Sequence, residues 1–426
     1  MEMSVSNPTV SKRTKYILGA QHLLAMFGAT VLVPFLTGMD PALALLGAGL
    51  GTLIFHYITG GIVPVFLGSS FAFISATSLI LAEQGIGAVK GGIIVTGLVY
   101  VVLAAIVKGV GVEAVKSFFP AIITGPIIIL IGLRLSSVAV SMAGIGTTEA
   151  GTMYIDTPAL SLALISLTAM IATITIGRSF FKLVPLLVSI ATGYVAAFIM
   201  DATLGTSFIN SQAIADAGWL GLSDNAMSFL TVMPVFDLSS IITIAPIAIV
   251  VFMEHLGDIA TNGSITGKNF FEKPGIHRTL LGDGLATLAS GLIGAPVNTT
   301  YSENAGVLAV TKVYDPSILR IAAFYAIALS FMGKLGALIQ NIPGPVMGGI
   351  SIILFGMIAT MGVRTLATAK INFTHPRNLA IVSVMIVAGS GISDLSITPN
   401  IIIGGLPIAG LMGIALNKIL PKDTEE

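Results

Sequence analysis

The sequence contains no cysteine and few charged residues. Without cysteine, disulfide bonds and thiolate chemistry are excluded. Aspartate, glutamate, lysine and arginine together make up only 9% of the 426 residues, whereas a soluble domain carries about 25%. Hydrophobic residues reach 55% and the mean hydropathy is +0.98. Such a chain has too little polar surface to fold in water, so we expect it to lie in a lipid bilayer.

The formal net charge is zero, which gives no indication of a nucleic-acid partner. The sequence also lacks a His-Glu-x-x-His helix, a phosphate-binding glycine loop and a Gly-x-Ser-x-Gly elbow. We therefore expect no metal site, no cofactor and no enzyme activity.

A membrane-spanning helix needs about 20 apolar residues, and the sequence provides about fourteen such stretches. We predict an all-α integral membrane protein with spans at residues 16–36, 41–60, 64–83, 88–108, 112–136, 157–176, 181–200, 240–260, 279–294, 299–312, 317–340, 344–361, 376–393 and 402–420.

The distribution of lysine and arginine predicts the orientation of the chain, because these residues concentrate in cytoplasmic connections. They alternate as about fourteen spans require, and the long connection 201–239 contains neither. Both termini are therefore predicted to be cytoplasmic, with residues 1–15 as a tail, in a multi-pass protein of the plasma membrane.

Three motifs recur in the same order in the two halves of the sequence. Gln21-His22-Leu23 returns as Glu254-His255-Leu256, Gly68-Ser69-Ser70-Phe71 as Asn298-Thr299-Thr300-Tyr301, and the pair Gly125 and Gly132 as Gly349 and Gly356. An odd number of spans in each half makes the second copy enter from the opposite face. We therefore predict two inverted repeats of about seven spans each, at residues 16–203 and 204–426.

The third and tenth spans are interrupted. Each opens with a proline, Pro64 or Pro296, passes through small hydroxyl residues and becomes apolar only afterwards. Non-helical backbone persists inside a membrane only where protein or a water-filled cavity satisfies it. We predict that each span is an extended segment followed by a half-helix whose N-terminus points at a solute in mid-membrane.

A carboxylate inside a membrane span costs about 2.5–3.5 kcal/mol, and we single out three acids at such positions. They are Glu254, Asp258 one helical turn later, and Glu303. Like charges so close together favour a shared proton, as proton coupling requires. Two alternatives stay open: Thr300 and Glu303 have the spacing of a helix capping box, and Asp258 could lie at the cytoplasmic end of its span.

Two histidines accompany these acids. His255 lies about 100° around the helix from Glu254, so we expect it to make a structural polar contact. His22, in the first span, is placed to hydrogen-bond across the protein interior.

Residues 303–312 read Glu-Asn-Ala-Gly-Val-Leu-Ala-Val-Thr-Lys. They resemble the signature of the nucleobase–ascorbate transporter family, also called nucleobase:cation symporter-2, in which Gln or Glu, Asn, any residue and Gly are followed after four positions by Thr. Five further stretches resemble its uracil permease branch: Gln21 to Leu23, Gly68 to Ser75, Glu254 to Gly257, Asn298 to Asn304 and Pro345 to Gly349.

The resemblance implies a core domain, residues 16–110 and 238–341, and a gate domain, residues 111–203 and 342–420. In this family the core moves against the gate as an elevator, often within a homodimer. The implied substrate is uracil, which enters together with a proton.

The resemblance also implies the roles of individual residues. Glu254 and Glu303 would bind the base, the backbone amides of Phe71 and Ser302 would complete the site, and Glu254 with Asp258 would carry the proton. The rings of Phe71 and Tyr301 are suited to pack on the faces of uracil. Supporting contacts are expected from His22, Ser70, Asn304 and Thr300.

Two positions depart from the family pattern. Asp258 stands where uracil permeases often carry His, and Ser302 stands where Gly is common. These departures leave xanthine, another nucleobase or an anion open as the substrate. A channel and a membrane-embedded enzyme that uses the acids are the alternatives from other classes.

Overall fold

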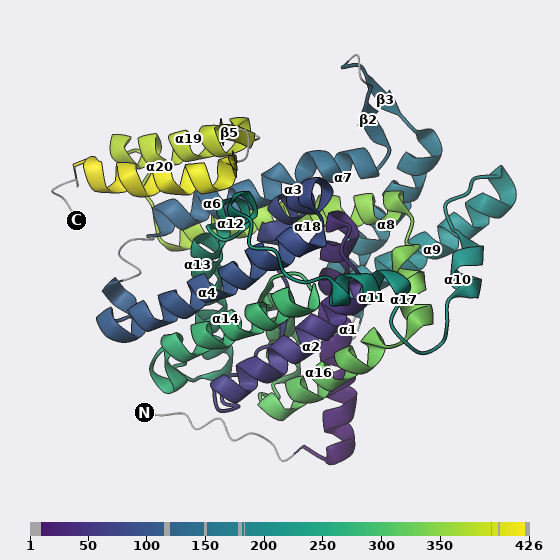
Figure 1. The fold of residues 1–426 in the computed structure, drawn as a ribbon, viewed down its shortest axis with the longest axis horizontal. Coiled ribbons are helices and arrows are strands. Elements are labelled where there is room, and N and C mark those ends of the chain that lie inside the picture. The colour runs from purple at the N-terminus through teal and green to yellow at the C-terminus, as the bar shows by residue number, and fades with distance from the viewer. Residues whose placement is uncertain are drawn as a thin grey trace.

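The structure is a computed structural model that describes residues 10–114, 120–148, 151–177, 181–182, 184–392, 394–398 and 401–421 (Figure 1). The elements of the first half are α1 (Lys12–Thr37), α2 (Pro41–Ile58), β1 (Leu67–Ser69), η1 (Phe71–Phe73), α3 (Ile74–Gln84), α4 (Ile86–Val110), α6 (Ala121–Arg134), α7 (Ser136–Met142), β2 (Ile145–Thr147), β3 (Met153–Ile155), α8 (Thr157–Ile176) and α9 (Pro185–Leu204).

The second half is also mostly helical. Its elements are α10 (Ser211–Asp216), α11 (Asp224–Thr231), α12 (Leu238–Ile244), α13 (Ile247–Thr266), η3 (Phe271–Gly275), α14 (Ile276–Ile293), β4 (Asn298–Thr300), α15 (Ser302–Thr311), α16 (Pro316–Ser330), α17 (Gly333–Gln340), α18 (Gly344–Thr368), α19 (Pro376–Gly391), β5 (Asp394–Thr398), β6 (Ile401–Gly404) and α20 (Gly405–Ile419).

Eight helices of the described chain are long and apolar enough to cross a membrane, or nine if α16 and α17 form one span. Each of the fourteen predicted ranges contains a helix or a strand followed by a helix. Several of these helices are too short or too polar to qualify by themselves, so the count of fourteen stays a prediction.

Acidic residues in the connections explain where four helices begin. Asp40, Asp156, Asp237 and Asp315 each accept a hydrogen bond from a backbone N–H in the first turn of the following helix. Such capping satisfies donors that have no partner within the helix. Burial alone would raise the pKa of Asp315, but hydrogen bonds from Lys15 and Ser317 hold that pKa below its usual range.

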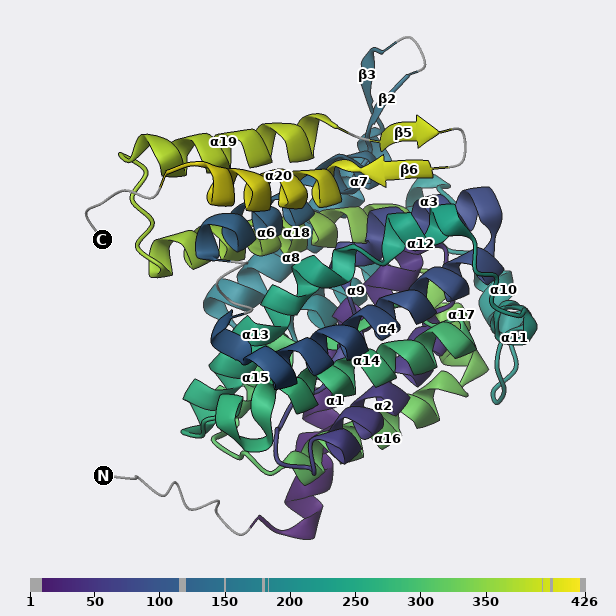
Figure 2. The same ribbon diagram turned by 60° about the vertical axis from the view of Figure 1, so that its left-hand side comes forward.

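The helices pack in two sets, which lie one above the other in both views (Figure 2). In the first set, α14 lies against α4 and α2, and α16 lies against α2 and α1. Helix α3, with η1 before it, also belongs to this set because it lies against α4 and α1, and α15 belongs to it because it lies against α1. In the second set, α18 contacts α6, α7, α8 and α9, while α19 contacts α20 and α6. Helix α13 touches both sets, because it contacts α4 and α15 as well as α6 and α20.

The two predicted extended segments pair with each other. Strands β1 and β4 are antiparallel, with Leu67 opposite Thr300, Gly68 opposite Thr299 and Ser69 opposite Asn298. The prediction of extended segments in the third and tenth spans is therefore confirmed. Because the strands run in opposite directions, η1 with α3 and α15 leave the pairing in opposite directions.

Some predicted elements differ from the observed ones. The span predicted at 317–340 is bent by 84° between α16 and α17. The span predicted at 240–260 consists of α12 and α13, separated near Pro246, and continues to Thr266. Proline disrupts helical hydrogen bonding, which explains the second break.

Further differences lie outside the spans. Helix α1 begins at Lys12, within the predicted tail, because the Ser11 hydroxyl caps it. The all-α prediction also missed two antiparallel hairpins, β2 with β3 and β5 with β6. Part of the predicted tail, residues 1–9, and residues 115–119 of the fifth predicted span lie outside the described residues.

Candidate substrate-binding site

The site lies where the two interrupted spans cross. Ser70 N–H donates to the Val297 carbonyl at 2.9 Å, and Tyr301 N–H donates to the Phe66 carbonyl at 3.0 Å. These bonds extend the β1–β4 pairing at both ends. Immediately afterwards η1 begins at Phe71 and α15 begins at Ser302. First-turn N–H groups lack partners within a helix and carry partial positive charge, so each start can bind an electronegative group.

The three predicted acids come together beside this crossing. The charges of Asp258 and Glu303 both act on Glu254, although Glu303 belongs to a different helix. The side chains of Glu254 and Glu303 are exposed, whereas Asp258 is buried. The structure therefore brings together the acids that the sequence singled out, and leaves two of them accessible.

Open space borders both acid-bearing helices. Gly257 follows Glu254 by three residues on α13, and Gly306 follows Glu303 by three residues on α15. A Cβ atom added to either glycine would meet no other group within 4 Å. Residues three apart lie on the same helix face. Each acid therefore has open space beside it on its own helix.

Thr300 holds Asp258 in place. The Thr300 hydroxyl donates to Asp258 Oδ2 at 2.6 Å. The capping box expected for Thr300 and Glu303 is wrong, because α15 has Tyr301 at its N-cap and no side-chain capping bond. Helix α13 continues past Asp258 to Thr266, and the position of Asp258 relative to the cytoplasmic end of its span stays a prediction.

Tyr301 stabilises the crossing by a hydrogen bond and by packing. Its hydroxyl donates to the Ser69 carbonyl at 2.9 Å and lies 3.4 Å from the Thr30 hydroxyl. A Cβ atom on Gly68 would lie 2.4 Å from the Tyr301 ring, so the ring occupies the space that only a glycine leaves free. Tyr301 is buried and Phe71 is half-buried. Stacking of their rings on a substrate stays a prediction.

His22 and Asn304 join α1 to α15. The Asn304 side-chain amide lies 3.1 Å from His22 Nδ1 and donates to the His22 carbonyl at 3.0 Å. Both residues are buried. The expectation that His22 hydrogen-bonds across the interior is confirmed.

The two serines of the predicted site differ in what the structure shows. Within the described chain, no hydrogen-bond partner reaches the buried Ser70 hydroxyl. Ser302 supplies the first backbone position of α15, and its side chain lies outside the described part. Their contact with a substrate stays a prediction.

Asp283 is a further buried acid beside the site, and it was not among the predicted site residues. This buried residue of α14 binds His255, with Asp283 Oδ2 at 2.7 Å from His255 Nδ1. Asp283 lies inside the predicted span 279–294, and this position by itself indicates an acid within the membrane. The expected structural polar contact of His255 is this bond.

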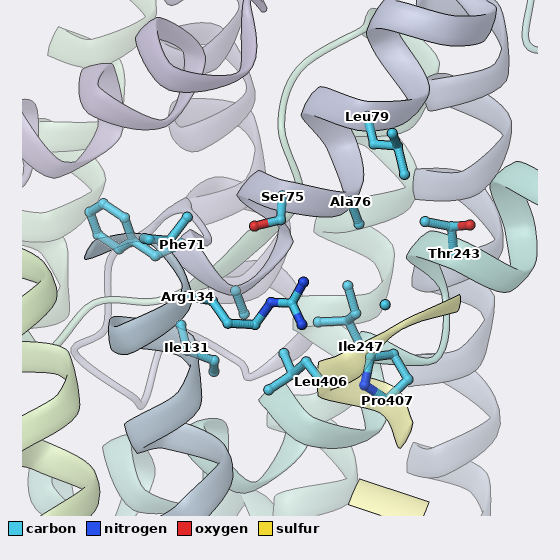
Figure 3. Close-up of a pocket in the computed structure, with 13 residues that line it drawn as sticks. Phe71, Ser75, Ala76, Leu79, Ile131, Arg134, Thr243, Ile247, Leu406 and Pro407 are labelled. Atoms are coloured by element: carbon cyan, nitrogen blue, oxygen red, sulfur yellow. The ribbon is translucent and has the colours of Figure 1, made fainter. Parts of the chain in front are cut away.

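A small cavity lies next to the crossing, between the two sets of helices (Figure 3). Phe71 and Ser75 line it from the first set, and Arg134 of α6 and Leu406 of α20 line it from the second. Its volume of about 50 Å³ holds a few water molecules. Arg134 donates to the carbonyls of Gly389 and Ile392 at 3.0 and 2.7 Å. Glu254 and Glu303 do not line this cavity.

The described residues contain no group of three or more histidine or acidic side chains arranged to hold a metal ion. The acids at the crossing can instead accept hydrogen bonds from a ligand and exchange protons.

A family model described as the permease family matches residues 13–397, which is most of the chain. The chain belongs to this family, the nucleobase:cation symporter-2 permeases. The resemblance seen in the sequence is therefore confirmed. Members of a permease family are transporters, which also agrees with the expectation that the chain is not an enzyme.

Several permeases match along almost their entire length. A probable uracil permease of Haemophilus influenzae is 41% identical over 416 residues, covering 98% of this chain and 96% of the relative. The uracil permease of Bacillus caldolyticus is 42% identical over 404 residues, covering 95% of this chain and 91% of the relative. A putative pyrimidine permease of Escherichia coli is 36% identical over 414 residues, covering 95% and 89%.

Solved structures of transporters share the fold of this permease. The transmembrane domain of a cyanobacterium bicarbonate transporter gives a TM-score of 0.63 at 14% identity, covering 94% of this chain and 96% of the other. The murine Solute Carrier 26 family member A9 anion transporter, in its inward-facing state, gives 0.68 at 12% identity, covering 96% and 68%. At these identities the likeness shows the fold alone. The permease is a multi-pass membrane protein.

Proposed function

We propose that this permease is a symporter that imports uracil together with a proton. The observation that carries the proposal is the pair of accessible acids, Glu254 and Glu303, beside a crossing at which two half-helices begin. The relatives named uracil permease, which match along nearly the whole chain, support uracil as the substrate.

Uracil fits the chemistry of this site. The base presents N–H donors and carbonyl acceptors. The carboxylates of Glu254 and Glu303 can accept from the N–H groups, and the first-turn amides at Phe71 and Ser302 can donate to the carbonyls. In this arrangement every polar group of the base is matched, as burial of a polar solute requires.

The proton is assigned to the acid cluster. Glu254, Asp258 and Glu303 act on one another electrostatically, so ionising all three in a low-dielectric interior is unfavourable. A proton shared between Glu254 and Asp258 removes one negative charge and supplies an acid that can donate to the substrate. Binding of uracil and binding of the proton would then favour each other.

Transport is proposed to occur by alternating access, with the core domain (16–110 and 238–341) moving against the gate domain (111–203 and 342–420). The packing of the helices in two sets and the cavity between them support this division. The proposal includes about fourteen spans in two inverted repeats, two cytoplasmic termini and a homodimer.

A second candidate substrate is a different oxopyrimidine or xanthine. Asp258, fixed by Thr300 at 2.6 Å, places a carboxylate where uracil permeases often carry His. An additional acceptor would suit a base with an additional N–H group. An anion is disfavoured, because Glu254 and Glu303 would repel it.

The test is uptake of labelled uracil by proteoliposomes that contain the purified protein. We expect accumulation when the outside is acidic and its loss when the pH gradient is collapsed. Equal uptake without the gradient would contradict proton coupling. A competition panel of unlabelled xanthine, other pyrimidines and bicarbonate distinguishes the substrates.

The residues are tested by Glu254→Gln and Glu303→Gln. Each change replaces a carboxyl group by an amide. A hydrogen bond to an ionisable group typically contributes about 1.5–3 kcal/mol, so uracil affinity should fall roughly tenfold to a hundredfold. Glu272→Gln is the matched control, because Glu272 is exposed in a connection and pairs with Asn269 at 2.8 Å. Thermal stabilisation by uracil reports binding, and unchanged stabilisation in both site variants would contradict the assignment.

A further inference from the structure

Behind the substrate site, three side chains of α13 and α14 form a hydrogen-bonded group. His255 Nδ1 lies 2.7 Å from Asp283 Oδ2, and His255 Nε2 lies 2.9 Å from the Thr279 hydroxyl. The Thr279 hydroxyl also donates to the Ile276 carbonyl at 3.0 Å. His255, Asp283 and Thr279 are all buried.

The protons in this group can be counted. A threonine hydroxyl has one hydrogen, and that of Thr279 is directed to the Ile276 carbonyl. We therefore assign the Thr279 oxygen as the acceptor from His255, with a proton on Nε2. One further proton lies between His255 Nδ1 and Asp283 Oδ2.

The group is consequently neutral wherever that last proton resides. If it resides on Nδ1, an imidazolium faces a carboxylate. If it resides on Oδ2, a neutral imidazole faces a carboxylic acid. A buried pair of this kind avoids the cost of an isolated interior charge.

Several titratable groups face Glu254. On its own helix this is Asp258, and the groups on neighbouring elements are Glu303 of α15, Tyr301 at the start of α15, Asp283 of α14 and Tyr100 of α4. The other titratable residues of the helices packed against α13 are Lys90, Lys108, His277, Arg278, Arg134 and Lys418. Of these, Lys90 donates to carbonyls of residues 229–232, and Arg134 donates to carbonyls at the end of α19.

Within the described chain, the groups that face Glu254 are acids and tyrosines, and the base nearest to Glu254 along α13 is His255. Glu254 and His255 are adjacent, about 100° apart around the helix. His255 thus faces α14 while Glu254 faces the open side of α13.

We propose that His255, Asp283 and Thr279 form a locked, neutral unit that keeps Asp283 out of proton exchange, so that the coupled proton is confined to Glu254, Asp258 and Glu303. His255 and Thr279 are positioning residues in this scheme. They set the number of charges beside the substrate site without touching the substrate. The inference rests on the proposed proton-coupled transport.

The first test is the pH dependence of uracil binding by purified variants. His255→Asn removes the basic partner of Asp283, whose carboxyl then titrates by itself and, where it is ionised, adds a negative charge near Glu254. The added negative charge should make the acids of the site keep their proton to higher pH. The pH at which uracil binding is half-maximal, called the midpoint below, should therefore rise by about half a pH unit or more. Asp283→Asn leaves the unit neutral, and its midpoint should match the wild type.

The double variant His255→Asn with Asp283→Asn should return the midpoint to the wild-type value, since no extra carboxylate remains. A purely structural role would weaken binding at every pH without this pattern. A fall in the midpoint for Asp283→Asn would overturn the proposal, because it would show that the unit of His255, Asp283 and Thr279 carries a net negative charge in the wild type.

A second pair of variants covers the case in which the charge variants fail to fold. Thr279→Val has nearly the same shape but cannot accept from His255 Nε2, so it should favour the Nδ1–H imidazole, ionise Asp283 and raise the midpoint. Thr279→Ser keeps the hydroxyl and should leave the midpoint unchanged. Equal midpoints for the two variants would contradict the neutral unit.

Calorimetry in buffers of different ionisation enthalpy separates this inference from the proposed function. Wild-type protein that takes up no proton on binding uracil would contradict proton coupling itself. Proton uptake that is the same in wild type and Asp283→Asn is expected here. A smaller uptake in Asp283→Asn would show that Asp283 exchanges protons and would overturn the inference alone.

Discussion

At the scale of single residues, the site depends on contacts made by side chains that carry no charge. Thr300 holds the buried Asp258, and Tyr301 fills the space beside Gly68. Neither contact follows from the residue type alone, because threonine and glycine are common in membrane helices. Each contact can be tested by a change of one or two atoms.

Thr300→Val should destabilise the protein and weaken transport. The isosteric change removes the hydroxyl that donates to Asp258 Oδ2, and an unsatisfied buried acceptor costs about 1–3 kcal/mol. Uptake assays and thermal unfolding of the same preparations measure both effects. Thr300→Ser keeps the hydroxyl and should stay close to wild type. If the two variants behave alike, the hydrogen bond has no role.

Gly68→Ala should displace the Tyr301 ring, because the new Cβ would lie 2.4 Å from it. Overpacking of this kind costs about 1–3 kcal/mol and would also disturb the half-helix that starts at Ser302. Thermal unfolding and uracil affinity report the change. Gly109→Ala is the matched control, since an added Cβ there meets no atom within 4 Å. Equal stability of the two variants would show that the crossing can adjust.

At the scale of elements, two lysines fix the short helices of the connection 201–239. Lys90 of α4 donates to the carbonyls of Phe229, Leu230 and Val232 at 3.0, 3.3 and 2.7 Å. Lys334 of α17 donates to two carbonyls at the end of α10, at 2.8 and 2.6 Å. In both cases a cation binds the carbonyl end of a helix, where it is favoured by the helix dipole.

Lys90→Met should loosen α11. The lysine is buried, and loss of hydrogen bonds to a charged group costs about 1.5–3 kcal/mol. Amide hydrogen exchange of residues 224–231 should therefore become roughly tenfold faster or more. Lys334→Met is the companion variant and should affect α10 in place of α11. Unchanged exchange in α11 would mean that other contacts hold this helix.

At the scale of the whole molecule, the proposed movement requires the core to slide against the gate. The chain has no cysteine, so introduced thiols are unique reporters. Ser75 of α3 and Leu406 of α20 line the same cavity from the two sets of helices (Figure 3). A bond between these positions would join the two sets.

Ser75→Cys combined with Leu406→Cys, treated with short bifunctional thiol reagents, should stop uracil uptake. A cleavable reagent should allow recovery after reduction, and the single variants should be insensitive. Binding of uracil, measured by thermal stabilisation, should persist in one locked state. Full uptake by completely cross-linked protein would contradict movement between core and gate.

The sequence by itself determined the membrane location, the two broken spans and the acids at their crossing. These features depend on local properties: mean hydropathy, prolines such as Pro64 and Pro296, and carboxylates inside apolar runs. Each can be recognised within about 20 residues, the length of one span. The two extended segments pair with each other because their backbone N–H and C=O groups need hydrogen-bond partners away from water.

Only the tertiary structure decided the partners of these groups. Thr300 binds Asp258 rather than capping its own helix, and His255 binds Asp283, which was not among the predicted site residues. These partners lie 42 and 28 residues apart in the chain. A hydrogen bond requires its atoms within about 3 Å in a suitable direction, and helix packing, which no local pattern specifies, sets that geometry.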